Sequence, residues 1–234
     1  MNSKRLKEGI ALSALLGFAA ILFIREQAAP PGQDPAAPSV SAGKVGAAGA
    51  FDYYLVALSW SPTWCESHPA DNEQCARRGY GFILHGLWPQ YEEGMGPRDC
   101  ATRQRPDRAT IERALAFMPS RGLIEHEWQT HGTCSGLDPG QYFALADRAY
   151  AAIRVPPELT AGSAAVAMNA GDVRSAFLRA DPRLREDMLA VTCHSGRLAE
   201  VRVCVDQALE PRTCGRGVRM RCPRDVPLRI PAVR

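Results

Sequence analysis

Lysine is absent from residues 51–234 of this 234-residue chain, although the same segment contains 23 arginines. A Cys-x-x-Cys pair is also absent, which argues against a thiol oxidoreductase. No internal repeat is evident, so a repeat architecture is not indicated. Histidine is scarce as well, with five residues in the chain, but three of the five fall within two short segments.

These two segments are 85–89, His-Gly-Leu-Trp-Pro, and 126–134, His-Glu-Trp-Gln-Thr-His-Gly-Thr-Cys. Imidazole has an unperturbed pKa of about 6.5, so two facing histidines can divide the roles of proton donor and proton acceptor near neutral pH. The second segment adds a carboxylate, Glu127, between two imidazoles. Together the segments indicate acid–base chemistry of the kind used at phosphorus.

The apolar spacing of residues 122–131 predicts a helix that carries the second segment. In a helix, Glu127 and His131 are four residues apart and share a face, while His126 and Thr130 share the neighbouring face. We therefore expect Glu127 and His131 to act in the same site.

The same geometry disfavours a zinc site of the His-Glu-x-x-His type, whose two histidines are four residues apart. Here His126 and His131 are five apart and would diverge by roughly 140° around a helix of about 3.6 residues per turn. We expect neither a metal nor another cofactor.

With the segment 51–62, Phe-Asp-Tyr-Tyr-Leu-Val-Ala-Leu-Ser-Trp-Ser-Pro, the two histidine motifs resemble the ribonuclease T2 family, over roughly residues 51–222. The resemblance implies an endoribonuclease that cleaves single-stranded RNA. The 2′-hydroxyl of the substrate attacks phosphorus, a 2′,3′-cyclic phosphate forms, and hydrolysis leaves a 3′-phosphate. DNA lacks that hydroxyl, so we expect no DNA cleavage.

The resemblance also implies roles for individual residues. His131 matches the general base and His85 the general acid of the family, while Glu127 and His126 match groups that contact the phosphate and its transition state. Positioned proton transfer typically contributes about 10²- to 10⁴-fold in rate.

One further residue, Trp88, matches the base-binding region of the family. Trp88 corresponds to a stacking platform for a base, and Gln90 and Tyr91 follow it as possible polar edges of that pocket. The family often has an acidic residue at the position of Gln90 and a glutamine at that of Ser59, so its base preference does not carry over.

The chain departs most clearly from the family at Thr130, where the family usually has a lysine. A guanidinium from elsewhere could replace that charge, or the site could work with less electrostatic help. The departure also leaves open an alternative function, an inactive or weakened RNA-binding protein on the same scaffold.

Each motif residue has a purely structural interpretation too. His85 could end a buried strand, since residues 80–84 are apolar and Gly86 suggests a tight turn. Trp88 and Trp128 could belong to the core. The joint occurrence of both segments favours the functional interpretation.

The N-terminus resembles an export signal, with Lys4, Arg5 and Lys7 before an apolar run over residues 10–24. As a helix those 15 residues would span about 22 Å, less than the roughly 30 Å hydrocarbon core of a bilayer. Residues 1–27 are therefore predicted to be a signal peptide or an uncleaved membrane anchor. Either one predicts a periplasmic or extracellular domain, and an uncleaved anchor would tether that domain to the membrane.

Residues 28–50 are rich in proline, alanine and glycine and are predicted to be a flexible linker before a catalytic domain at 51–234. All eight cysteines lie in that domain, an even number that predicts disulfides in an exported protein and argues against a nucleophilic Cys134. Spacing alone leaves 105 pairings. The family resemblance implies the pairs Cys65–Cys75, Cys100–Cys134, Cys193–Cys222 and Cys204–Cys214.

Hydrophobic patterns predict strands at 52–60, 81–84, 188–194 and 197–205 and helices at 110–117, 122–131, 141–153 and 172–180. The strands do not alternate regularly with the helices, which is typical of the α+β class. We expect one disulfide-stabilised α+β domain, a monomer, with a mainly antiparallel central sheet flanked by helices.

Overall fold

The computed structural model describes residues 47–160, 162–223 and 226–233. The predicted signal or anchor, residues 1–27, and most of the predicted linker lie outside these residues. The last linker residues that are described pack against the domain, because the N–H of Gly49 donates a hydrogen bond to the carbonyl of Cys134. Among the described helices, none has the length and apolar character needed to cross a membrane.

A six-stranded sheet forms the centre, in the order β2-β1-β5-β6-β3, with β4 also paired to β5. Every pairing is antiparallel except that of β5 with β6, which is parallel. The strands are β1 (Tyr53–Trp60), β2 (Phe82–Gln90), β3 (Val166–Met168), β4 (Leu189–His194), β5 (Arg197–Val205) and β6 (Leu228–Ile230). The predicted α+β class with a mainly antiparallel sheet is confirmed.

Strands β4 and β5 form a hairpin. Its two turn residues, Ser195 and Gly196, both have positive φ, 47° and 72°, as a tight two-residue hairpin turn requires.

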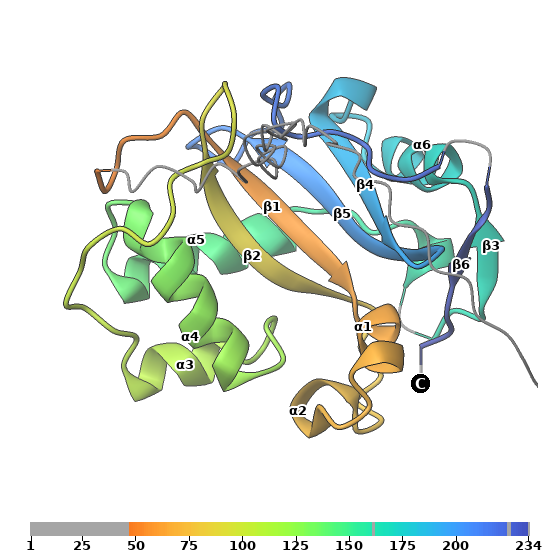
Figure 1. Ribbon diagram of the computed structural model, residues 1–234, viewed down its shortest axis with the longest axis horizontal. Helices are drawn as coiled ribbons and strands as arrows, with labels where there is room; N and C mark the ends of the chain where they lie inside the picture. Colours follow the sequence, from red (N-terminus) through yellow and green to blue (C-terminus); the bar gives the residue numbers. More distant parts are fainter. Residues whose placement is uncertain (1–46, 161, 224–225, 234) are drawn as a thin grey trace, which may run out of the picture. The chain divides into compact units, whose positions relative to one another are not determined.

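Helices flank the sheet, with α3, α4 and α5 on the side of β2 and α6 beside β4 and β3 (Figure 1). The α-helices are α1 (Ser61–Ser67), α2 (Asn72–Cys75), α3 (Arg108–Ala114), α4 (Arg121–Thr130), α5 (Pro139–Ala151) and α6 (Ala170–Ala180). Three short 3₁₀ helices occupy η1 (Gly132–Cys134), η2 (Pro157–Leu159) and η3 (Glu186–Met188).

Capping residues explain why several helices begin earlier than their apolar pattern suggests. Asp107 accepts a hydrogen bond from the N–H of Thr110, so α3 begins at Arg108. Asp138 and Gln141 form a reciprocal capping box at the start of α5. Ser120 caps α4 through the N–H of Leu123.

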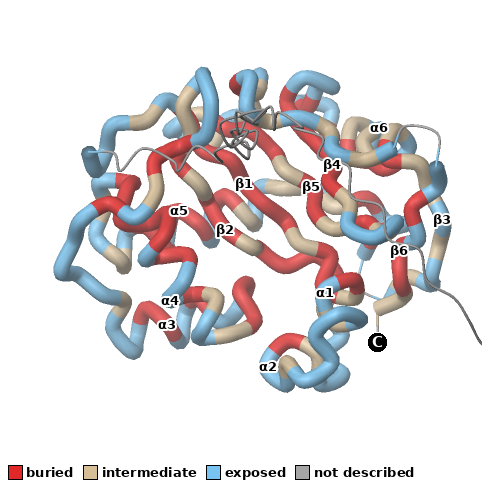
Figure 2. Tube along the Cα trace, viewed as in Figure 1, coloured by how far each residue is buried: buried red, intermediate tan, exposed pale blue. Residues whose placement is uncertain are grey.

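Strand β1 is buried along most of its length (Figure 2), and Ser59 alone among its residues is only partly buried. Its residues Tyr54, Val56, Leu58 and Trp60 belong to the main core, beneath the helices. The alternate residues, Tyr53 and Leu55, pack with Cys204 in a smaller cluster on the opposite face. That opposite face carries the histidine site.

The four disulfides have the pairing that the family resemblance implies: Cys65–Cys75, Cys100–Cys134, Cys193–Cys222 and Cys204–Cys214. The Cys100–Cys134 bond ties the loop after β2 to the residues that directly follow α4. Loss of one native bridge commonly costs about 2 to 5 kcal/mol in a small secreted domain.

Candidate active site

A β-bulge in β2 carries the first histidine. Leu84 pairs with Leu58 and Gly86 with Ala57, so His85 is an extra residue in the ladder. The strand continues to Gln90, and the alternative in which it ends at residue 84 with a tight turn at Gly86 is wrong. The extra residue shifts the alternation, so Leu84 and Leu87 both reach the main core while His85 and Trp88 line a cavity.

Gly86 allows a close approach between β2 and the side chain of Glu127 on α4. A Cβ atom at this position would lie 2.0 Å from Oε2 of Glu127 and 2.2 Å from Nε1 of Trp88, far inside any real contact. Glycine at 86 is therefore a condition for placing the Glu127 carboxylate against the strand.

Helix α4 presents Glu127 and His126 to that strand. The Glu127 side chain is only 1 % exposed, and its Oε1 lies 3.5 Å from Nε2 of His85 and 4.0 Å from Nε2 of His126. The indole N–H of Trp88 donates to its Oε2 at 2.6 Å. One buried carboxylate thus faces two imidazoles and an indole, while the His126 side chain remains 61 % exposed.

The predicted helix ends one residue early, and His131 is its C-cap. The N–H of His131 still donates to the carbonyl of Glu127, which keeps both residues on one side of the helix end. The His131 ring stacks against Trp88, with centroids 5.0 Å apart, and the His85 ring meets the same indole edge-on at 5.1 Å. Trp88 therefore contacts both histidine rings.

A carboxylate from β5 completes the surroundings of His85. Oε1 of Glu200 lies 2.5 Å from Nδ1 of His85, and Oε2 of Glu200 accepts from Arg202. Burial alone would lower the pKa of His85, but the hydrogen bond to Glu200 and the negative charges of Glu127 and Glu200 together raise it. The imidazolium form of His85 is favoured.

Burial is the largest cause of the pKa shifts of Glu127 and His131, and in each case it disfavours the charged form. Burial raises the pKa of Glu127 to about 7, against the opposing effects of His85 and Trp88. Burial, with the positive charges of Arg98 and His85, lowers the pKa of His131 to about 3. At neutral pH, His131 is an uncharged imidazole and His85 the more readily protonated one.

Two cavities meet at the histidines. The first, about 310 Å³, contains His85, Glu127 and His131 in its wall together with Trp88 and Gln90. The second, about 640 Å³, shares only His85 and His126 with the first. Tyr91 lines neither of them.

Three guanidinium groups, those of Arg98, Arg202 and Arg221, line the first cavity. Arg202 lies over the Trp88 ring, 5.2 Å from its centroid. Thr130 is buried, 3 % exposed, and is not in the wall of this cavity. Positive charge beside the histidines therefore comes from arginines that lie elsewhere in the sequence.

Across the described ranges, no three side chains of the types His, Cys, Asp or Glu form a group that could hold a metal ion.

Comparison with known proteins identifies the family. The model of the ribonuclease T2 family matches residues 51–214. The chain belongs to the ribonuclease T2 family. A ribonuclease of Aeromonas hydrophila is 54 % identical over 101 residues, which cover 43 % of this chain and 46 % of that protein. The chain thus matches about half the length of this curated relative.

Solved structures of a ribonuclease and of a ribonuclease-related protein share the fold. An RNase-related protein from Calystegia sepium superposes with a TM-score of 0.62 at 25 % identity, covering 79 % of this chain and 98 % of that one. The Y101A mutant of ribonuclease MC1, solved in complex with 5′-UMP, superposes with a TM-score of 0.57 at 20 % identity, covering 76 % of this chain and 97 % of that one.

Within this T2 fold, sequence reasoning missed Glu200, Arg202 and Arg98. Glu200 and Arg202 alternate with the buried Val201 and Val203, so two charged side chains lie among apolar residues in the middle of the strand. Such a pattern on a central strand signals a polar site on one face of the sheet. Arg98 lies in the loop after β2, where no pattern indicates its role.

Proposed function

We propose that this protein is an endoribonuclease that cleaves single-stranded RNA by metal-independent transesterification. The observation that carries the proposal is a pair of imidazoles with opposite pKa shifts, both in contact with Trp88 and both lining one cavity with the buried Glu127. An uncharged base and a protonated acid at one site are what in-line transfer at phosphorus requires.

His131 acts as the general base. Its Nδ1 is buried and has no hydrogen-bond partner among the described residues, which leaves Nε2 to accept the proton of the ribose 2′-hydroxyl. The pKa of His131 is low in the free protein, and the negative charge of a bound phosphate raises its proton affinity. The deprotonated 2′-oxygen then bonds to phosphorus.

His85 acts as the general acid. Nδ1 is held by Glu200, so Nε2 donates its proton to the 5′-oxygen as the bond from phosphorus to that oxygen breaks. The products of this step are a 2′,3′-cyclic phosphate and a free 5′-hydroxyl. Water then opens the cyclic phosphate with the two histidines in exchanged roles, which leaves a 3′-phosphate.

Glu127, His126 and nearby arginines act on the phosphate. Glu127 with its proton, favoured by its raised pKa, donates a hydrogen bond to a non-bridging oxygen, and His126 contacts the same group from the open side. Arg98 and Arg202 supply positive charge where the family usually has a lysine. Preorganised charge of this kind stabilises the transition state more than the ground state.

The base on the 5′ side of the scissile bond occupies the first cavity, with Trp88 and Gln90 in its wall. His131 and Arg202 already contact the Trp88 ring, so Trp88 also positions catalytic groups. A role for Tyr91 has no support from its position outside this wall. The RNase MC1 mutant solved with 5′-UMP supports a nucleotide as ligand of this fold.

The four disulfides support localisation in an oxidising compartment, either the periplasm or the extracellular space. N-terminal sequencing of the mature protein tests whether residues 1–27 are removed as a signal or kept as an anchor.

The decisive experiment is incubation of the purified protein with yeast RNA in the presence of EDTA. We expect acid-soluble nucleotides and a transient 2′,3′-cyclic phosphate. Single-stranded DNA incubated under the same conditions should not be cleaved. Intact RNA, bound but not cut, would instead support the alternative of a non-catalytic RNA-binding protein.

A further inference from the structure

Trp64, on α1, is an exposed aromatic residue outside the histidine site. It is 41 % exposed, and none of the other exposed large apolar side chains in the described residues, Met95, Leu115 and Val226, is aromatic. Tryptophan is normally well buried, so an exposed indole in a cavity wall indicates a binding surface.

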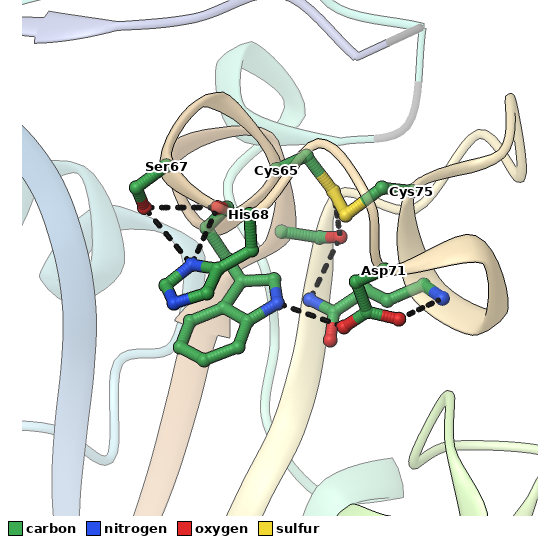
Figure 3. The surroundings of a disulfide bond; sticks show 8 residues. Cys65, Ser67, His68, Asp71 and Cys75 are labelled. Atoms are coloured by element: carbon green, nitrogen blue, oxygen red, sulfur yellow. Dashed lines mark hydrogen bonds between the residues drawn. A yellow bond between two sulfur atoms is a disulfide. The ribbon is translucent and has the colours of Figure 1, made fainter.

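The indole is held in one orientation. Its N–H donates to Oδ2 of Asp71 at 3.0 Å, and its ring stacks on His68 with centroids 3.5 Å apart and planes 8° from parallel. The Cys65–Cys75 disulfide ties α1 to α2 on this segment, where His68 and Asp71 lie together (Figure 3). A ring that is already immobilised loses little entropy when a ligand stacks on it.

Trp64 and His68 line the second cavity, the one of about 640 Å³ that also contains His85 and His126. Thr63 is part of the same wall, and its buried Oγ1 has no hydrogen-bond partner among the described residues. The cavity thus combines an aromatic face with an unpartnered hydroxyl, which suits a nucleobase: every base has a ring to stack and polar edges to pair.

The direction of the substrate follows from the two histidines. His131 lines only the first cavity, whereas His85 lines both. In the proposed reaction His85 protonates the oxygen of the leaving nucleotide, so the RNA on the 3′ side of the scissile bond enters the second cavity.

The distance along the sheet places Trp64 beyond the leaving nucleotide. Ala57 lies opposite Gly86, next to His85, and α1 begins four residues later at Ser61. Those four residues correspond to about 13 Å of strand, at about 3.3 Å per residue. A strand of RNA must extend past the leaving nucleotide to reach the ring.

We propose that the Trp64–His68 stack binds a base of the RNA on the 3′ side, beyond the leaving nucleotide, and so favours polynucleotides over dinucleotides. This inference rests on the proposed ribonuclease function. Stacking on an aromatic side chain tolerates any base, so the subsite adds affinity for longer RNA with little sequence preference.

The test uses oligonucleotides with a single ribonucleotide in a deoxynucleotide chain, because only the linkage after the ribose can be cut. One substrate has one deoxynucleotide on the 3′ side, a second has four, and a third carries its extension on the 5′ side. For Trp64→Ala we expect kcat/KM to fall about 5- to 100-fold on the 3′-extended substrate, the range that base stacking supplies. The other two substrates should be cut at the wild-type rate.

Matched variants separate binding from folding. Leu115→Ala removes an exposed apolar side chain outside the second cavity and should leave kcat/KM unchanged on all three substrates. Trp64→Phe keeps an aromatic ring and should retain most of the wild-type kcat/KM on the 3′-extended substrate. The proposal would be overturned if Trp64→Ala lowered kcat/KM equally on all three substrates, or if it left kcat/KM on the 3′-extended substrate unchanged.

If the wild-type protein cuts none of the substrates, that result rejects the ribonuclease function but does not test base binding at Trp64. Binding of a fluorescein-labelled all-deoxy oligonucleotide then tests the subsite by itself. Weaker binding by Trp64→Ala than by wild type supports it, and equal binding rejects it.

Discussion

Nδ1 of His85 lies 2.5 Å from Oε1 of Glu200, a residue 115 positions away in the sequence. An ionised carboxylate only accepts hydrogen bonds, so Nδ1 carries the proton and Nε2 is directed to Glu127. Glu200 in turn is held by Arg202, which also lies over Trp88. A β5 residue thus fixes the orientation of a β2 histidine, as the carboxylate of a catalytic triad does for its imidazole.

Glu200→Gln should move the alkaline limb of the kcat/KM profile to lower pH. Glu200 raises the pKa of His85, and without its charge the imidazolium loses its proton at a lower pH. The measurement is kcat/KM on a dinucleotide from pH 4 to 9. Glu112→Gln, an exposed carboxylate on α3, is the control and should leave the profile unchanged. An alkaline limb at the wild-type position in Glu200→Gln would show that Glu200 has only a structural role.

His85→Ala and His131→Ala should each reduce RNA cleavage by at least about a hundredfold, the contribution of a positioned acid or base. His126→Ala should cost less, because its side chain is largely exposed and lies 4.0 Å from Glu127. Circular dichroism checks that each variant is folded. A folded His85→Ala protein with near-normal cleavage would remove His85 from the mechanism.

Gly86→Ala should inactivate the protein through Glu127. The new Cβ would lie 2.0 Å from Oε2 of Glu127, so the carboxylate must leave its position between His85 and Trp88. We expect a large fall in kcat together with a lower melting temperature. Gly171→Ala is the control, since nothing lies within 4 Å of its added Cβ and alanine favours a helix. Wild-type kcat in Gly86→Ala would mean that the position of Glu127 does not matter.

Much of the fold could be predicted because its longer elements have clear periodicity. Strand β5 has the predicted bounds, and α4 differs by one residue at each end. The elements that were missed are short: α1 and α2 have seven and four residues, and β3 and β6 three each. Segments of that length contain too few residues for a hydrophobic pattern to repeat.

The site was predictable only where its residues are close in sequence. Glu127 and His131 share a helix end, and a four-residue spacing indicates their proximity. Glu200 and His85 meet because β2 and β5 both pair with β1, and the bulge at His85 depends on the register of that pairing. Neither the strand order nor the bulge leaves a local signal in the sequence.

Glu127→Gln should stabilise the protein at neutral and alkaline pH while reducing its activity. The folded pKa of Glu127 is about 7 and its ordinary value 4.5, so between these values the folded state holds a proton that the unfolded state has lost. The contribution of Glu127 to the stability of the wild-type protein therefore falls as pH rises from 4.5 to about 7, and stays reduced above that. Glutamine has no charge to bury, and its amide oxygen can still accept from Trp88. Thermal unfolding is measured at pH 4.5, 6, 7 and 8.5. The melting temperature of the variant minus that of wild type should increase up to pH 7 and then stay constant. A stability difference that is the same at every pH would mean that packing, rather than the ionisation of Glu127, separates the two proteins.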